Sequence, residues 1–379
     1  MHSRSWLRHS RLDAGDPLPD FADSHDPFLS LHFLRALESS CAVGAPTAWE
    51  PAHLLLSRGN SPAGLLPLYR KHDSRGEYIF DHSWANAYHR HGLEYYPKLV
   101  TAIPFTPVPG SRLLLTPGER AADWLPVVFE AVRQECLSQG ATGWHGLFVD
   151  ESWVAPAIQA GFAIREGCRF HWVNQGFREF SDFLDTLTSK KRKDIRRERR
   201  KLEEAGVVCR KVSGREADSG CWDFFYQCYE RTYLEHGQRP YLGRDFFSQI
   251  AHSMAEQLSL VIAEGPAGPL ASALFFHSPT TLYGRYWGAL DTVDFLHFEV
   301  CYYQGIEMCI ERGLTGFDPG TQGEHKLLRG FAPRLTHSLH WLANPAFQAA
   351  IQRFVAEESR EIRRYLEAAE AALPFRQRS

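Results

Sequence analysis

Residues 283–331 read YGRYWGALDTVDFLHFEVCYYQGIEMCIERGLTGFDPGTQGEHKLLRGF, and the rest of the chain is organised around this stretch. The aromatic-rich YGRYW predicts a strand, residues 296–312 have helical spacing, and LTGFDPG predicts a second strand ending near Asp318. A polar loop punctuated by glycines, residues 321–330, follows that strand. In open α/β sheets, ligands bind beyond the carboxyl ends of the strands. We therefore expect the function of the protein to centre on this loop.

The loop carries four ionisable side chains, which are Glu324, His325, Lys326 and Arg329. A transfer reaction needs a base that removes a proton from the attacking group and donors that hold developing negative charge. We expect His325 or Glu324 to act as the base, with Asp318 orienting the attacking group or the imidazole. Lys326 and Arg329 are candidates for binding a phosphate or carboxylate. The alternative is a solvent-facing turn whose charges pair with their neighbours.

Arg285 lies beside Tyr283 on the first predicted strand, and Asp318 ends the second. These three side chains lie on the two predicted strands that flank the helix, close to the polar loop. Arg285 and Tyr283 are therefore candidates for contacts with a substrate. The alternative is a buried ion pair between Arg285 and Asp318 that bridges adjacent strands.

The helix between these strands is unusually polar and aromatic. Glu299, Tyr302 and Tyr303 follow i, i+3, i+4 spacing, which places them on one helical face. This face suits the wall of a substrate pocket, with Glu299 as a substrate contact. It equally suits a helix that packs aromatic rings in the core around one hydrogen-bonded glutamate.

Length and composition set the class of protein. A chain of 379 residues is long enough for two domains, and 44% hydrophobic residues can fill their cores. No apolar run is long enough to span a membrane, and the amino terminus lacks the apolar core of a secretory signal. The eight cysteines are scattered and form no CxxC motif. We expect a soluble cytoplasmic protein with reduced thiols, no disulfide framework and no metal site.

One segment concentrates positive charge. Residues 190–201, KKRKDIRRERRK, hold nine basic residues against Asp194 and Glu198, a local charge of +7. Since the whole chain has a formal charge of −3, the remainder carries −3 − 7, or −10. On a helix these side chains are candidates to bind nucleic acid or another polyphosphate, including coenzyme A. The alternative is a solvated helical face. The candidate contacts are Lys190, Lys191, Arg192, Arg196, Arg197, Arg199 and Arg200.

The order of predicted elements indicates a mixed α/β chain with two domains. The second half reads β, α, α, β, β, β, α, β, then a loop and a last strand, and the first half repeats this order less clearly. We expect an amino-terminal arm over residues 1–26, a first domain over 27–178, and a second over 179–379. The second domain would include the basic helix, expected over residues 180–205 and ended by a glycine.

The quoted stretch, with LYGRYWG, LHFEVCYYQGIE and PGTQGEHKLLRGF, resembles the FemAB-like proteins of the GNAT acyltransferase superfamily. The first half adds GEYIFDHSWANAYHRHG, YYPKLVTAIPFTPVPGSRLL and RFHWVN, and the middle adds SKKRKDIRRERRKL and PYLGRDFF. The resemblance covers roughly residues 27–375. Thr321 departs from it, because the family pattern has alanine at that position.

The resemblance implies two tandem GNAT-like domains, each a mixed sheet flanked by helices. It implies an N-acyltransferase or aminoacyltransferase that moves an acyl group to an amine by direct attack. The donor would be acyl-CoA, as in ordinary GNAT enzymes, or aminoacyl-tRNA, as in Fem-type peptidyltransferases, with no tightly bound cofactor. The acceptor would be the amine of a small molecule or peptide. The alternative is a non-catalytic protein that keeps the fold to bind a peptide or glycan, and the oligomeric state stays open.

The first domain offers a second group of candidates. In GNAT domains, the loop at the position of IPFTPVPGSRLLL donates backbone N–H groups to the coenzyme A pyrophosphate. Gly110, Ser111 and Arg112 are the candidates here, although the prolines of this loop remove donors and the usual glycine spacing is absent. The alternative is a rigid connection. Nearby, Asp81 and His82 are candidates for an acid–base pair.

Overall fold

The computed structural model describes residues 4–12, 18–19, 21, 25–321 and 323–376. The chain forms two compact units. The first comprises residues 1–168 and 335–364, and the second comprises residues 169–334 and 365–379. The first boundary between the units lies between residues 168 and 169, before the predicted one at residue 178. Residues 335–364, which lie in the second half of the sequence, belong to the first unit.

Three elements contribute residues to both units. They are β9 (Ala163–Val173), β15 (Ala332–Leu342) and α11 (Pro345–Ala371). Among the described residues, no helix is both long enough and apolar enough to cross a membrane.

The first unit contains two sheets. One has the strand order β1-β3-β4-β7, and in the other β15 is followed by β8, β6, β5 and β2. Its strands are β1 (Arg4–His9), β2 (Trp49–Pro51), β3 (His53–Arg58), β4 (Ser61–Leu66), β5 (Tyr69–Lys71), β6 (Lys98–Thr101), β7 (Leu114–Leu115) and β8 (Gly143–Val149). Its helices are α1 (Leu31–Ser39), α2 (His82–Arg90), α3 (Ala121–Ser138), η1 (Glu151–Trp153) and α4 (Val154–Gln159).

The core of the first unit forms against α3. Trp124, Val128 and Val132 recur at helical spacing on its buried face and pack with Trp144 of β8. The parallel pairing of β6 with β8 places Lys98 and His145 on neighbouring strands of this unit.

The second unit contains one mixed sheet with the strand order β10-β11-β12-β13-β14-β9. Its strands are β10 (Val208–Ser213), β11 (Leu258–Gly265), β12 (Gly268–His277), β13 (Thr281–Ala289) and β14 (Gly316–Asp318). Its helical segments are α5 (Phe180–Thr186), α6 (Ser189–Glu204), α7 (Ser219–Glu235), α8 (Arg244–Ser253), η2 (Ala255–Gln257), α9 (Leu296–Phe298), η3 (Glu299–Tyr303), α10 (Gln304–Glu311) and η4 (Glu324–Arg329).

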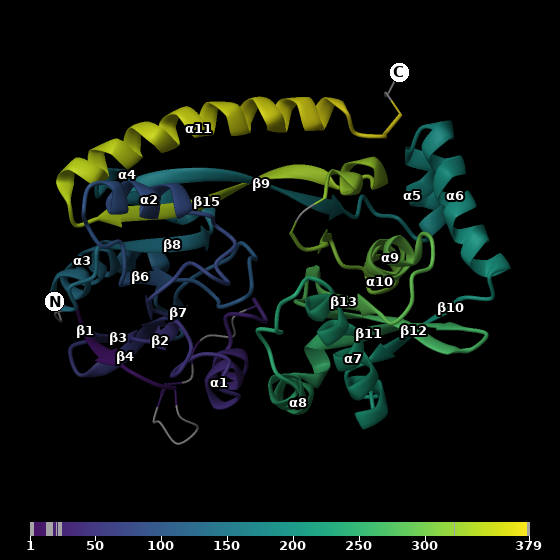
Figure 1. Cartoon of the computed structure of the whole chain (residues 1–379), viewed down its shortest axis with the longest axis horizontal. Coiled ribbons are helices and arrows are strands. Elements are labelled where there is room, and N and C mark those ends of the chain that lie inside the picture. The colour runs from purple at the N-terminus through teal and green to yellow at the C-terminus, as the bar shows by residue number, and fades with distance from the viewer. Residues whose placement is uncertain (1–3, 13–17, 20, 22–24, 322, 377–379) are drawn as a thin grey trace. The chain divides into compact units, whose positions relative to one another are not determined.

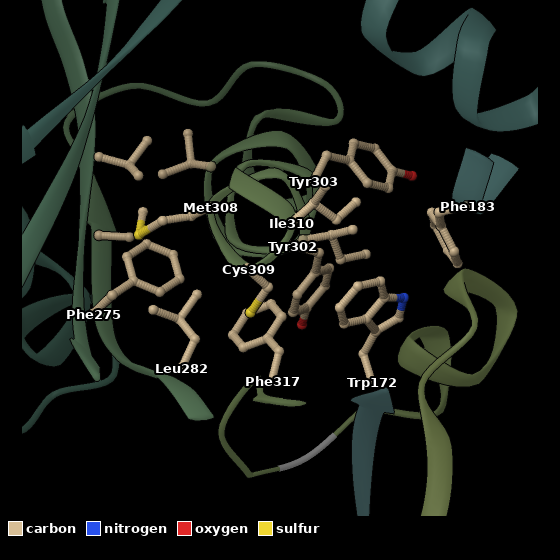
Figure 2. Packing of buried hydrophobic residues seen from close by; sticks show 14 of the residues in the cluster. Trp172, Phe183, Phe275, Leu282, Tyr302, Tyr303, Met308, Cys309, Ile310 and Phe317 are labelled. Atoms are coloured by element: carbon tan, nitrogen blue, oxygen red, sulfur yellow. The ribbon is translucent and has the colours of Figure 1, made fainter. Parts of the chain in front are cut away.

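The sheet of the second unit is covered on both faces, with α7 on one and the α9–α10 helix on the other (Figure 1). Phe275 and Leu282 point to the α9–α10 side, where they pack with Phe317 of β14 (Figure 2). Gly305 permits this contact, since a Cβ there would lie 2.5 Å from the Phe317 ring. The core thus fixes the helix between β13 and β14 against both strands.

The helix between β13 and β14 runs without interruption through α9, η3 and α10, but its middle segment η3 is a π-helix. Such π segments are rare and often occur at functional sites. Tyr302 and Tyr303 of this segment point in different directions (Figure 2). Their hydroxyls contact different partners, which are His325 for Tyr302 and Glu198 for Tyr303. The pocket wall expected of Glu299, Tyr302 and Tyr303 stays a prediction.

Two local expectations differ from the structure. The helix expected over residues 180–205 is two helices, α5 and α6, separated at Leu187, whose extended backbone ends α5. Residues 77–81 form no strand in the described part of the chain, and α2 begins directly after them. Residues 163–173 form the single strand β9. Part of the expected arm forms β1, which pairs with β3, while residues 1–3, 13–17, 20 and 22–24 lie outside the described residues.

Candidate active site

The parallel pairing of β13 with β14 ends where the candidate site begins. Tyr283 pairs with Asp318, the last residue of β14. The β13 ladder is irregular just beyond this point, because Gly284 and Tyr286 pair with consecutive residues of β12 and Arg285 is skipped. This bulge removes Arg285 from the regular alternation of the strand. The two strands therefore stop pairing at the position expected for substrate entry.

Asp318 is buried and bonds to groups other than His325. Its Oδ1 accepts a hydrogen bond from Arg169 Nη2 at 2.8 Å and another from the backbone N–H of Gly320. Burial raises the pKa of Asp318, but Arg169 and the Gly320 hydrogen bond outweigh burial and hold it below its usual value. The predicted role of Asp318 in orienting His325 is therefore not supported, because its carboxylate holds β9 and the start of the loop.

His325 is bound instead by Tyr302 of the π segment. Its Nε2 lies 2.8 Å from the Tyr302 hydroxyl. Burial and the nearby charges of Lys326 and Arg329 lower the pKa of His325 below its ordinary value. The imidazole is therefore neutral at pH 7, as a general base must be. Glu324 is exposed, and Tyr365 donates a hydrogen bond to it at 3.3 Å.

Lys326 is almost fully buried and holds the backbone of the loop. Its Nζ donates to the carbonyl oxygens of Gly320 and Thr321 at 2.8 and 3.0 Å. Burial lowers the pKa of Lys326 to about 7, although Asp318 opposes this shift. These contacts do not support the predicted role of Lys326 in binding a substrate anion, because the amine clamps the backbone between β14 and the loop.

Replacing Lys326 with methionine is expected to change how stability depends on pH. Because the folded pKa lies below the ordinary value of 10.5, the unfolded chain binds more protons between about pH 7 and pH 10. The wild-type free energy of unfolding should therefore gain up to about 1.4 kcal/mol per pH unit from this group. Urea unfolding of both proteins at pH 7, 8 and 9 measures the difference, and parallel curves would contradict the shift.

Three further candidates, Glu299, Tyr283 and Arg285, also lie in the second unit. Glu299 accepts two hydrogen bonds from Arg199 of α6 and one from Gln304, so its predicted role as a substrate contact is replaced by a structural ion pair. Tyr283 and Arg285 are half-buried at the end of the parallel pairing. Their substrate-binding roles stay predictions.

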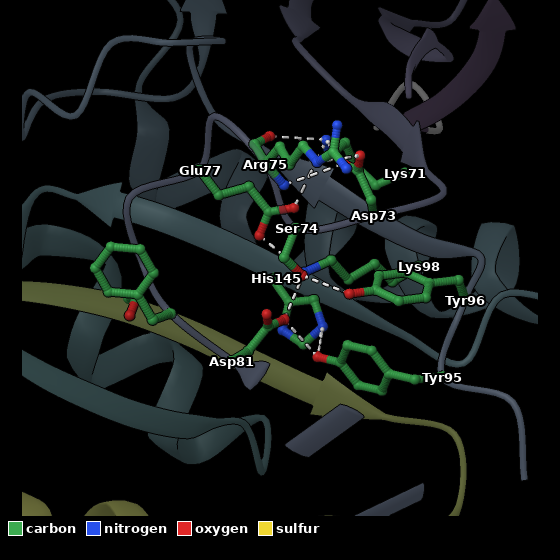
Figure 3. Close-up of polar contacts among 12 residues, drawn as sticks. Lys71, Asp73, Ser74, Arg75, Glu77, Asp81, Tyr95, Tyr96, Lys98 and His145 are labelled. Carbon is green, nitrogen blue, oxygen red and sulfur yellow. Dashed lines mark hydrogen bonds and ion pairs between the residues drawn. The ribbon is translucent and has the colours of Figure 1, made fainter. Parts of the chain in front are cut away.

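In the first unit, Asp81 lies in a buried network rather than in a pair with His82 (Figure 3). Its Oδ2 accepts hydrogen bonds from Lys98 Nζ at 2.5 Å and from the Tyr95 hydroxyl at 2.7 Å. Lys98 also bonds to Glu77 Oε2 at 2.8 Å. His82 is exposed at the start of α2 and stacks on the ring of Phe80, so the predicted acid–base pair with Asp81 is not formed.

The same network continues through two histidines. The hydroxyl of Tyr95 lies 3.3 Å from His145 Nε2, and His145 Nδ1 lies 2.7 Å from His340 Nδ1. Burial lowers the pKa of His145 to about 3 and that of His340 well below its ordinary value, so both rings are neutral. Since Tyr95 donates to Asp81, His145 donates from Nε2 and accepts from His340. The charge of Asp81 thus sets the tautomer of each ring.

The proline-rich loop of the first unit does not offer the arginine expected of a phosphate site. Arg112 is fully buried and donates to the backbone carbonyls of Leu147, Val108 and Ser111. Its guanidinium therefore holds this loop to β8, which contradicts its predicted phosphate contact. Gly110 bridges to the end of β8, and the Ser111 hydroxyl donates to Leu113 O. The phosphate-binding roles of these two residues stay predictions.

The structure divides the basic segment into two sets. Arg199 pairs with Glu299 and Glu307, Arg192 pairs with Asp185, and Lys191 lies 3.9 Å from Asp194. These three side chains are half-buried against the protein. The others are exposed, namely Lys190, Lys193, Arg196, Arg197, Arg200 and Lys201. We call these six residues the outer basic face of α6, and they are the part of the segment available to a polyanion.

Arg169 and Lys98 were not among the sequence candidates, and the contact of Tyr302 with His325 was not predicted. Arg169 and Lys98 hold the buried carboxylates, and Tyr302 holds His325. Their partners lie on distant segments, 149, 17 and 23 residues away in sequence. Within the described residues, no group of three potential ligands is placed to hold a metal ion.

Comparison with protein families gives a match to the FemAB-like family, described as peptidoglycan biosynthesis/recognition, over residues 11–377. The chain belongs to the FemAB-like family. No curated protein matches the chain. The family assignment agrees with the motifs around the His325 loop and covers both compact units.

Solved structures share the fold of this FemAB-like protein at low sequence identity. L-PGS from Bacillus licheniformis aligns with a TM-score of 0.51 and 11% identity, over 84% of this chain and 95% of that one. FemX aligns with a TM-score of 0.51 and 11% identity, over 86% and 95%. A tandem GNAT protein from the clavulanic acid biosynthesis pathway covers 90% and 99%, with 10% identity and a TM-score of 0.45. The expected α/β class, two units whose mixed sheets are flanked by helices, is confirmed.

Proposed function

We propose that this FemAB-like protein is an N-acyltransferase that moves an acyl or aminoacyl group from an activated ester or thioester to an amine. The observation that carries the proposal is the neutral imidazole of His325, held by Tyr302 in the loop beyond the point where β13 and β14 stop pairing. Membership of the FemAB-like family supports transfer chemistry of this general kind.

The residues of the loop suit direct attack by the amine. In the tautomer whose Nε2–H donates to the Tyr302 hydroxyl, Nδ1 takes the proton that the amine loses. The amine nitrogen then forms the new bond to the acyl carbon, and the ester or thioester bond to the donor breaks. Arg285 is the proposed contact for negative charge on the donor, because the bulge sets it apart from the regular strand. No covalent intermediate on the protein is required.

The outer basic face of α6 favours aminoacyl-tRNA as the donor. Its six exposed cations suit a phosphate backbone, and binding of this kind weakens steeply with salt. Acyl-CoA is the second candidate, supported by the GNAT-like fold. The burial of Arg112 removes one expected coenzyme A contact from the first unit and so favours tRNA.

Binding assays separate the two donors. We expect charged tRNA to be retained at low salt and released as salt rises, and retention to fall at least about tenfold when Arg196, Arg197 and Arg200 are changed to glutamine. Coenzyme A should leave the melting temperature unchanged. Stabilisation by coenzyme A, with no retention of tRNA, would assign the thioester donor instead.

The second candidate function is recognition of a peptide or glycan without chemistry. It is favoured by the family description, which includes recognition, and by the ion pairs that occupy Asp318 and Glu299. Incubation of the protein with aminoacyl-tRNA and bacterial cell-wall precursors, followed by mass spectrometry, distinguishes the two functions. A mass increase equal to one aminoacyl residue supports transfer, and binding of a precursor without any increase supports recognition.

A further inference from the structure

The basic helix α6 buries one acid on its inner face. Glu198 is 8% exposed and lies in line with Ile195 and Leu202, which are also buried. A buried carboxylate is costly unless a charged partner compensates it. The cations of the outer basic face point to solvent, so the close partner of Glu198 comes from elsewhere in the second unit.

That partner is Arg329, at the end of the His325 loop. Its Nη2 lies 3.0 Å from each carboxylate oxygen of Glu198, and its Nε donates to the Tyr303 hydroxyl at 2.9 Å. Tyr303 in turn donates to Glu198 Oε2. The guanidinium lies 3.4 Å above the ring of Phe298. Arg329 is therefore fixed by α6 on one side and by the α9–η3 helix on the other, which does not suit its predicted contact with a substrate anion.

The same guanidinium also holds the loop. Arg329 Nη1 donates to the backbone carbonyl of His325 at 3.1 Å, across the short helical turn η4. The imidazole of His325 bonds to Tyr302, the residue before Tyr303. An unbroken set of contacts therefore leads from Glu198 through Arg329 to His325. A change in the strength of the Glu198–Arg329 pair must act on the loop.

We propose that Glu198 is a positioning residue that couples the outer basic face of α6 to the His325 loop, so that a polyanion bound on that face tightens the loop. The cations of the outer face and Arg329 both attract the negative charge of the Glu198 carboxylate. When phosphates neutralise them, Arg329 becomes the principal counter-charge, and its pair with Glu198 strengthens. The catalytic meaning of the coupling rests on the proposed function, but the coupling itself is measurable without turnover.

Glu198→Gln tests the link directly. Amide hydrogen exchange of residues 324–330 should become at least about tenfold faster, since glutamine removes the charge that holds Arg329. The pKa of His325, followed by NMR, should rise toward its ordinary value as the ring loses burial. Glu203→Gln is the matched control, because Glu203 is exposed on the same helix, and it should change neither quantity. A lower melting temperature for Glu198→Gln with unchanged loop exchange and His325 titration would overturn the proposal.

The outer face supplies a second test that does not depend on the stability of Glu198→Gln. The exposed triple variant Arg196→Gln/Arg197→Gln/Arg200→Gln should slow exchange of residues 324–330 roughly threefold at low salt, because it mimics neutralisation by phosphate. Deacylated tRNA should slow exchange of the wild-type loop in the same direction, and Glu198→Gln should abolish that response. Unchanged exchange in the triple variant, or a tRNA response that persists in Glu198→Gln, would overturn the coupling.

These outcomes separate the coupling from the proposed function. If tRNA does not bind, tRNA is excluded as the donor. The triple variant still decides whether the outer face acts on the loop. If no acyl transfer is found but the loop responds as described, the coupling stands and serves recognition rather than chemistry.

Discussion

Lys98→Met should lower the free energy of unfolding by about 3–5 kcal/mol at pH 7.5. Lys98 is fully buried, and its amine is the shared partner of Glu77 and Asp81. Methionine keeps the volume of the side chain but leaves two carboxylates in a site with little water. Lys71 lies 4.0 Å from Glu77 and only partly replaces the lost charge. Urea unfolding followed by tryptophan fluorescence measures the effect.

The loss should depend on pH in a defined direction. In the wild type, burial raises the pKa of Glu77 to about 7, and Lys98 opposes that shift. Burial also raises the pKa of Asp81, but the charge and hydrogen bond of Lys98 act together with other nearby groups to hold it below its ordinary value. Without Lys98, both folded pKa values rise above those of the unfolded chain. The variant therefore gains stability as the pH falls toward about 4, where the neutral acids are favoured, and the deficit at pH 5.5 should be smaller than at pH 7.5.

Two controls define the cause of the Lys98 effect. The triple variant Glu77→Gln/Asp81→Asn/Lys98→Met removes all three charges and should recover much of the lost stability. Arg231→Met breaks an exposed pair with Glu235 and should cost less than about 1 kcal/mol. A Lys98→Met loss no larger than that of Arg231→Met, or one that grows as the pH falls, would contradict the buried network.

His325→Ala should reduce the rate of acyl transfer by about 10²–10⁴-fold, the usual contribution of a general base. The imidazole is half-buried and bonds to Tyr302, whereas Lys326 and Arg329 fix the backbone around it. Removing the ring leaves these backbone contacts in place. We therefore expect the melting temperature to change little, while the rate constant for transfer falls by the factor given above.

The rate is best measured in single turnover with the donor that the binding assays identify. His252→Ala is the matched control, since His252 is exposed on α8 in the same unit. Glu324→Gln tests the rival base, and its exposure leads us to expect a smaller loss than that of His325→Ala. Full activity of His325→Ala together with loss in Glu324→Gln would transfer the role of base to Glu324.

Local sequence patterns were enough to predict the frame of the second unit. The helical spacing of residues 296–312 and the apolar strands around it predict the β13, helix and β14 order, because periodicity reports which face of each element is buried. The glycines at 320, 323 and 330 mark backbone with positive φ, so the turn around the loop was also readable. The π segment was not, because helical spacing of apolar residues does not distinguish a π turn from an α turn.

In the candidate site, too, the sequence predicted which residues are neighbours but not how their side chains are paired. The sequence brought Glu324, His325, Lys326 and Arg329 together because they are neighbours in the chain. It did not reveal that Lys326 and Arg329 point into the protein, where they hold backbone carbonyls and Glu198. Acidic and basic residues in a run look alike whether they are solvated or buried, so only packing separates Glu198 from the exposed charges of its helix.

The amino-acid sequence alone determined the α/β class, the resemblance to the FemAB-like family and the loop that carries His325. These follow from periodicity, glycine placement and motifs, which are properties of short segments. The tertiary structure decided which charged groups are paired, because the partners of Asp318, Asp81 and Glu198 lie on distant segments. Charge pairing depends on burial and on distances between such segments, and neither quantity is encoded in local order.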